Sequence, residues 1–152
     1  MPQSLCTIRV HLVFSTKFRN ALITPIIEPE LYAYMAEILK NLDSPAIAIG
    51  GTEDHVHVLF SLSKNHALTK VVESLKGDSS RWIKAKGATF RTFYWQTGYA
   101  AFSIGKSGET DLIHYIQNQK THHKKSDFKT ELRTLLDKYE LIYNEEYLWE
   151  EA

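Results

Sequence analysis

Two pairs of residues in this 152-residue chain have types and spacings that suit chemistry. His55 and His57 stand one residue apart in the run EDHVHVLF. In a β-strand their side chains share one face, because successive side chains alternate between faces. Two parallel imidazoles on a rigid strand can clamp a metal ion. Taken alone, so short a pattern more often marks structural histidines, so both interpretations stay open.

The second pair lies in HYIQNQKTHHKK, where Tyr115 and Gln119 are four residues apart and share one face of a predicted helix. Most tyrosines in the middle of a helix belong to the core or its rim. Here a basic run follows, and a phenolic oxygen beside cations can attack a phosphate. Because its free pKa is ~10, the phenol needs a cation or a base to activate it. A metal held by His55 and His57 could stabilise the charge that develops on the phosphate.

The elements that must position these residues follow the order β-α-β-β-α-β and end in helices. This order predicts a ferredoxin-like (RRM-like) α+β sandwich, an antiparallel sheet with helices on one face, plus C-terminal helices that carry Tyr115. An aromatic segment is predicted to form two short strands that meet near Gly98. The predicted ranges are strands over 6–16, 44–54, 55–63 and 89–105, and helices over 28–43, 66–87, 109–125 and 127–139.

The predicted sheet assigns opposite roles to alternate residues of its third strand. We expect Val56, Val58 and Phe60 to pack under the helices while the two histidines face outward, on a central strand. His11, on the first strand, is expected to face the same surface. The length suits one domain, 1–152, with a core over about 1–104 and the tyrosine helix and last helix over 109–139.

Composition indicates the cellular compartment of the protein and the charge of its surface. No apolar run approaches the ~18 residues that span a bilayer, and the first residues lack a signal-peptide pattern. The single Cys6 fits a reducing compartment. We therefore expect a cytoplasmic protein that does not contact a membrane. The net charge is zero, but residues 76–125 carry +6 and residues 126–152 carry −5. The basic zone is either a polyanion-binding surface or an ordinary solvated one.

Five stretches together resemble the single-tyrosine HUH transposases of bacterial insertion sequences, the IS200-like group. The resemblance runs from about residue 7 to residue 149. It implies that His55 and His57 are metal ligands, Gln119 the third protein ligand and Tyr115 the catalytic nucleophile, with Mg²⁺ or Mn²⁺ as the cofactor. The stretches are HLVFSTKFR, GGTEDHVHVLFSL, SLKGDSSRWI, WQTGYAAFSIGKS and YIQNQKTHHKK.

The resemblance also implies a reaction and its partners. Members of the family cut and rejoin single-stranded DNA beside hairpins at the ends of the element, through a 5′-phosphotyrosine. They act as homodimers, in which the tyrosine helix of one subunit can complete the site of the other. Basic side chains near the predicted site would contact the DNA backbone. These are Lys17, Arg19, Arg81, Lys84, Lys120, His122, His123 and Lys124.

An alternative is a domesticated relative that binds nucleic acid on the same fold without cutting it. Retention of His55, His57, Tyr115 and Gln119 favours the transposase. A histidine-triad hydrolase also carries alternating histidines on a strand, but the next alternating position here is Leu59, which disfavours that class.

Overall fold

The computed structural model describes residues 2–149, so residues 1 and 150–152 of the predicted domain lie outside the described residues. Among the described residues, no helix is both long and apolar enough to cross a membrane. Short 3₁₀ turns occupy Lys17–Arg19, Ala88–Phe90 and Lys106–Gly108. The other elements are β1 (Arg9–Ser15), α1 (Glu28–Asn41), β2 (Ala46–Gly51), β3 (His55–Ser61), α2 (Leu68–Lys84), β4 (Ala100–Ser103), α3 (Glu109–Gln117), α4 (Gln119–His122), α5 (Phe128–Lys138) and α6 (Glu145–Leu148).

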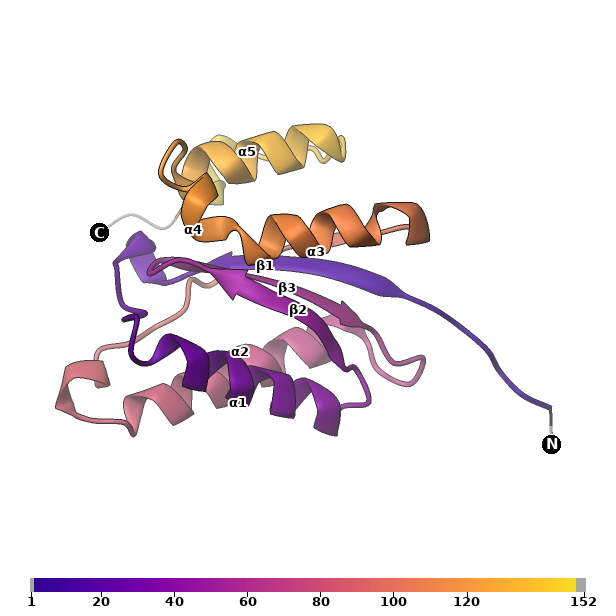
Figure 1. Ribbon diagram of the computed structural model, residues 1–152, viewed down its shortest axis with the longest axis horizontal. Helices are drawn as coiled ribbons and strands as arrows, with labels where there is room; N and C mark the ends of the chain where they lie inside the picture. Colours follow the sequence, from indigo (N-terminus) through magenta and orange to yellow (C-terminus); the bar gives the residue numbers. More distant parts are fainter. Residues whose placement is uncertain (1, 150–152) are drawn as a thin grey trace.

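The four strands form one antiparallel sheet in the order β2-β3-β1-β4, with α1 and α2 together on one face (Figure 1). This confirms the predicted ferredoxin-like α+β fold, with the first and third strands at the centre. Val56, Val58 and Phe60 are fully buried against α1 and α2, as predicted. The alternation of side chains therefore sends His55 and His57 to the opposite face of β3.

That opposite face is not open to solvent, and here the expectation that the histidines face outward is wrong. Both have no exposed surface, because α3, α4 and α5 form a third layer over the sheet (Figure 1). The layer packs because α5 presents an apolar stripe, Phe128, Leu132 and Leu136, to Val13 and its neighbours. A sheet covered on both faces places the two imidazoles in a low-dielectric interior.

Two of the predicted elements differ from the structure. The aromatic segment 89–105 forms one strand, β4, instead of two, because Phe93 and Trp95 insert into the core under α2. The indole of Trp95 donates to Ser79 Oγ at 3.0 Å, which satisfies its polar atom in that core. The predicted helix 109–125 is divided at Asn118, whose backbone (φ −102°, ψ 21°) separates α3 from α4.

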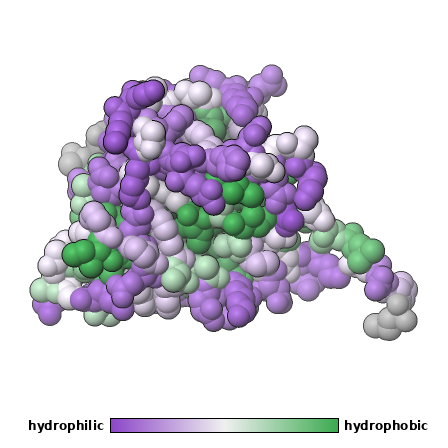
Figure 2. All heavy atoms as spheres, in the orientation of Figure 1, coloured by the Kyte–Doolittle hydropathy of each residue, from purple (hydrophilic) through white to green (hydrophobic). Residues whose placement is uncertain are grey.

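The tyrosine helix α3 lies unusually close to strand β2. A Cβ atom added to Gly50 would lie 2.2 Å from the carbonyl oxygen of Ile116, so only glycine permits this approach. The same contact carries apolar packing of Ile116 on Ala48 and Leu59. In Figure 2 most of this face is hydrophilic, with an apolar area near its middle, where Figure 1 places α3 over the edge strand β2. The position of Tyr115, next to Ile116, is therefore set by Gly50.

Candidate functional site

The two histidines of β3 have hydrogen-bond partners on their outer ring nitrogens. His55 Nδ1 lies 2.7 Å from Asp54 Oδ1 and 3.0 Å from Thr52 Oγ1. His57 Nδ1 lies 2.8 Å from Nε2 of His11, which faces the same surface as predicted. Such outer contacts fix the orientation and tautomer of metal-binding imidazoles. With both Nδ1 atoms engaged on the outer side, the Nε2 atoms of the two histidines face the inner side.

The buried position of the histidines shifts their pKa values in different directions. Burial lowers the pKa of His11 to about 3, and the neighbouring His57 adds to this, so His11 is neutral where its Nε2 meets His57 Nδ1. Burial also lowers the pKa of His57, against an opposing effect of Glu131. For His55 burial acts in the same direction, but hydrogen bonds to Asp54 and Glu131 outweigh it and raise the pKa to about 9.

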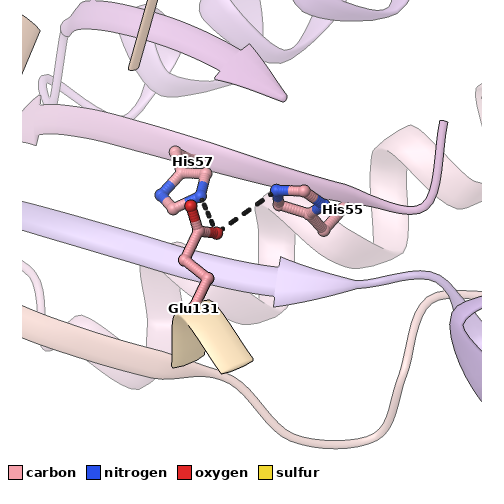
Figure 3. A group of neighbouring side chains, drawn as sticks. All are labelled: His55, His57 and Glu131. Carbon is pink, nitrogen blue, oxygen red and sulfur yellow. Dashed lines mark hydrogen bonds and ion pairs between the residues drawn. The ribbon is translucent and has the colours of Figure 1, made fainter. Parts of the chain in front are cut away.

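A carboxylate that the sequence analysis missed lies between the two inner Nε2 atoms. Glu131 Oε1 is 2.8 Å from His57 Nε2 and 3.4 Å from His55 Nε2. Figure 3 shows both rings and the carboxylate directed toward one another, with Glu131 reaching in from α5. Burial alone would raise the pKa of Glu131, but contacts with His123, His55 and His57 hold it far below its usual range. Glu131 is therefore ionised in this site.

A signal for Glu131 was present in the sequence. Phe128, Glu131, Leu132 and Leu135 follow the spacing of one helix face, so the pattern of the last helix places a carboxylate on its apolar stripe. A charged group at such a position needs a partner, because burying it alone is costly.

The predicted nucleophile and the predicted third ligand both reach this group of side chains. The Tyr115 hydroxyl donates to Glu131 Oε2, and its ring lies edge-on to that of His57, with 5.6 Å between centroids. Gln119 Oε1 lies 3.0 Å from His55 Nε2, and the Gln119 amide donates to the carbonyl oxygen of Tyr115 at 3.3 Å. Burial, followed by the hydrogen bond to Glu131, raises the pKa of Tyr115 above its usual value, so the phenol is protonated in this arrangement.

A cavity of about 590 Å³ opens beside Tyr115, between α3 and α5. Tyr115 and His122 line it on one side and Glu131 on another, so the phenol is accessible from the cavity although the imidazoles of β3 are buried. Several polar or small residues lie among the apolar side chains of the remaining wall. They are Ser103, Gly105, Ser107, Gly108, Asp111, Ser126, Thr134 and Lys138.

Two of the predicted DNA-contacting residues, His122 and His123, lie at the tyrosine and its partner Glu131, whereas Lys120 pairs with α1. The ring of His122 is 4.8 Å from that of Tyr115. His123 Nε2 is 3.1 Å from Glu131 Oε2, and Lys120 is paired with Glu28 at the start of α1. His123 is thus tied to the carboxylate of the site, while His122 is exposed beside the phenol.

The other predicted DNA-contacting residues do not converge on the tyrosine. Lys17 and Lys84 meet at the ring of Tyr94, with Nζ 5.6 Å and 3.8 Å from its centroid. Arg81 is an exposed residue of α2, on the opposite face of the sheet, and pairs with Asp78. Two more cations lie apart from these: Arg19 stands over the ring of Trp149 at 5.5 Å, and Lys124 is exposed after α4.

The donor atoms of the site suit a metal ion. His55, His57 and Glu131 each offer one ligand atom, and these atoms all lie within 4.8 Å of one another. Imidazole nitrogens with a carboxylate oxygen form a mixed set that divalent transition metals accept readily. Gln119 Oε1 contacts His55 Nε2 and adds a neutral oxygen to this set of donor atoms.

Comparison with known proteins gives consistent matches. The family described as "Transposase IS200 like" matches residues 4–119. The ISDra2 transposase TnpA of Deinococcus radiodurans is 23% identical over 114 residues, which cover 72% of this chain and 81% of the relative. A crystal structure assigned to a transposase of Deinococcus radiodurans R1 superposes with a TM-score of 0.61 at 21% identity, over 78% of this chain and 98% of that one. A REP-associated tyrosine transposase bound to a REP hairpin has a TM-score of 0.61 at 11% identity, over 81% of this chain and 73% of that one.

Proposed function

Because this chain belongs to the family of IS200-like transposases and is an enzyme of DNA transposition, we propose that it cuts and rejoins single-stranded DNA with Tyr115 as the nucleophile. The observation that carries this proposal is the convergence of Tyr115, His57 and Gln119 at one place. The Tyr115 ring contacts that of His57, 58 positions earlier in the chain, and Gln119 contacts the adjacent His55. A nucleophile beside convergent ligand atoms is the arrangement that phosphoryl transfer needs.

The proposed reaction is a transesterification. Tyr115 Oη attacks the phosphorus of a phosphodiester, so an O–P bond forms while the bond from phosphorus to the 3′ oxygen breaks. The phenolic proton leaves Oη and the departing 3′ oxygen gains a proton, giving a 5′-phosphotyrosine and a free 3′-hydroxyl. A 3′-hydroxyl from another strand then attacks the phosphotyrosine, which restores a phosphodiester and the free tyrosine without ATP.

We propose that His55, His57 and Gln119 hold a divalent cation, Mn²⁺ or Mg²⁺. Two imidazoles suit Mn²⁺ readily and Mg²⁺ less so, since Mg²⁺ prefers oxygen ligands. When bound, the cation supplies positive charge against the charge that develops on the phosphate. The outer contacts of His11 and Asp54 support this assignment, because they leave the inner nitrogens of both histidines as ligands.

We propose single-stranded DNA that contains a hairpin as the substrate. The solved REP-associated relative is bound to a REP hairpin, and the cavity beside Tyr115 gives a strand access to the phenol. Lys17 and Lys84, grouped on the exposed ring of Tyr94, offer a cation–aromatic surface of the kind that binds a backbone and stacks a base. From the family resemblance we also propose a homodimer. Since Tyr115 contacts His57 of its own chain, exchange of the tyrosine helix is not needed to complete a site.

The proposal is tested with labelled single-stranded oligonucleotides copied from palindromic DNA that flanks the gene. With Mn²⁺ present, the wild type should give a covalent protein–DNA band, and Tyr115→Phe should give none while it still binds the hairpin. His57→Ala, or EDTA added to the wild type, should stop cleavage. Adducts that persist in Tyr115→Phe would contradict the assigned nucleophile, and cleavage that survives both His57→Ala and EDTA would contradict the metal site.

A further inference from the structure

We propose that Glu131 of α5 is an oxygen ligand of the cation held by His55 and His57, and that its second oxygen positions Tyr115. This inference rests on the proposed function, because it concerns the same metal site. The matched family region ends at residue 119, so the family match assigns no role to α5. The ligand would therefore come from a segment beyond that match.

The donor atoms of the site are spaced as ligands of one ion are. Glu131 Oε1 lies 2.8 Å from His57 Nε2 and 3.4 Å from His55 Nε2, and Gln119 Oε1 lies 3.0 Å from His55 Nε2. Neighbouring ligand atoms around a cation with bonds of ~2.1 Å stand about 3 Å apart. These three distances match those between neighbouring ligand atoms in one coordination shell.

Contacts on the outer side hold both histidines in a fixed direction. Asp54 and His11 engage the outer nitrogens of the two histidines, so the inner nitrogens point at Glu131 (Figure 3). A carboxylate that only satisfied one imidazole would not need both rings anchored from behind. Rings anchored on Nδ1 and converging through Nε2 on one carboxylate oxygen are arranged as a metal centre with its outer contacts.

Glu131 lies in an apolar environment that disfavours an unpaired carboxylate. Glu131 is 5% exposed and lies on the apolar stripe of α5, where a leucine would pack without loss of hydration. A buried carboxylate persists when it is paired or ligates a metal. Two imidazoles and one amide bind Mg²⁺ and Mn²⁺ less strongly than a set that includes an anionic oxygen. Both cations favour carboxylate oxygen, so Glu131 would raise the affinity of the site.

The second oxygen connects the cation to the nucleophile. Glu131 Oε2 accepts a hydrogen bond from the Tyr115 hydroxyl, while Oε1 faces the two imidazoles. One carboxylate therefore fixes the distance between the phenolic oxygen and the metal site. Positioning of this kind contributes to rate because a reacting atom displaced by about 1 Å loses much of its reactivity.

The experiment measures Mn²⁺ binding directly, by electron paramagnetic resonance of free Mn²⁺ and by calorimetry, on the full chain without DNA. Glu131→Gln keeps the shape of the side chain, and Glu131→Leu fills the same volume on an apolar stripe. Asp137→Asn is the matched control, since it neutralises an exposed carboxylate of the same helix. His57→Ala tests the metal site itself, and thermal melts establish that each variant is folded.

We expect Mn²⁺ affinity to fall at least tenfold in both Glu131 variants, to be lost in His57→Ala and to be unchanged in Asp137→Asn. If His57→Ala loses Mn²⁺ while the Glu131 variants bind as the wild type does, the inference is overturned and the proposed function stands. Tighter binding in the Glu131 variants also overturns it, because the carboxylate would then compete with the cation. If His57→Ala binds Mn²⁺ normally, the metal site of the proposed function fails instead.

Discussion

Replacement of Gly50 by alanine tests how the tyrosine helix is held on the sheet. The added Cβ would lie 2.2 Å from the carbonyl oxygen of Ile116 and 3.0 Å from its Cγ2. Ordinary contacts between such atoms are about 3.5 Å, so α3 has to retreat from β2 by about 1 Å. The obstacle is backbone, which cannot rotate away as the end of a flexible side chain can.

Two effects follow from that retreat. Overpacking of this kind costs about 1–3 kcal/mol of the free energy of unfolding. Tyr115 precedes Ile116 on the same helix, so its hydroxyl moves away from His57 and Glu131 by a similar distance. A misplacement of about 1 Å can reduce the rate of the chemical step about 100-fold. We therefore expect Gly50→Ala to melt at a lower temperature and to form the covalent DNA adduct about 100 times more slowly.

The assay is the rate of adduct formation on a labelled hairpin oligonucleotide, measured at a temperature where the variant is fully folded. Gly77→Ala is the matched control: its added Cβ meets Arg81 at 3.6 Å, an ordinary contact, and alanine in a helix interior should stabilise by about 0.5–1 kcal/mol. A Gly50→Ala variant with wild-type melting and rate would refute the close packing of α3. Lower stability with an unchanged rate would refute the positioning of Tyr115 by Gly50.

Two further predictions concern His11, which contacts His57, and Asp127, which caps the start of α5. His11→Ala removes the hydrogen-bond partner of His57 Nδ1, and Mn²⁺ affinity, measured by calorimetry, should fall about 10–100-fold; an unchanged affinity would mean that His11 does not orient His57. Asp127→Ala removes the side-chain oxygen that accepts from the Thr130 amide at 2.9 Å, at the start of α5. It should cost about 0.5–2 kcal/mol in urea unfolding, whereas Asp127→Asn, which can still cap the helix, should cost less.

The alternation of side chains in a strand made the central part of the fold predictable. The period of two in HVHVLF separates Val56, Val58 and Phe60 from the histidines, and the structure has this separation. The four-residue spacing of Tyr115 and Gln119 likewise predicted that both side chains reach one site, and they do so although the helix is divided at Asn118. Patterns of this kind are local, so a single sequence carries them.

What the sequence did not predict depends on contacts between distant segments. His55 and His57 are buried because α5 packs over them. The apolar stripe of α5 predicts that one face of this helix is buried, but it does not predict which surface that face covers. Trp95 packs in the core where its indole nitrogen donates to Ser79, sixteen residues earlier. Strand propensity does not predict a hydrogen bond between such distant residues. Glu131 was missed for a similar reason, since its partners lie 74 and 76 positions earlier in the chain.

The order of the site along the chain has a consequence for synthesis on the ribosome. His57 and Glu131 are separated by 74 residues, and Glu131 is translated last. At ~5–20 residues per second, about 4–15 s pass between them. During that interval the nascent chain contains the histidines but lacks the carboxylate that would join the cation to the nucleophile. The proposed cation site and its link to Tyr115 are therefore complete only after α5 has been translated.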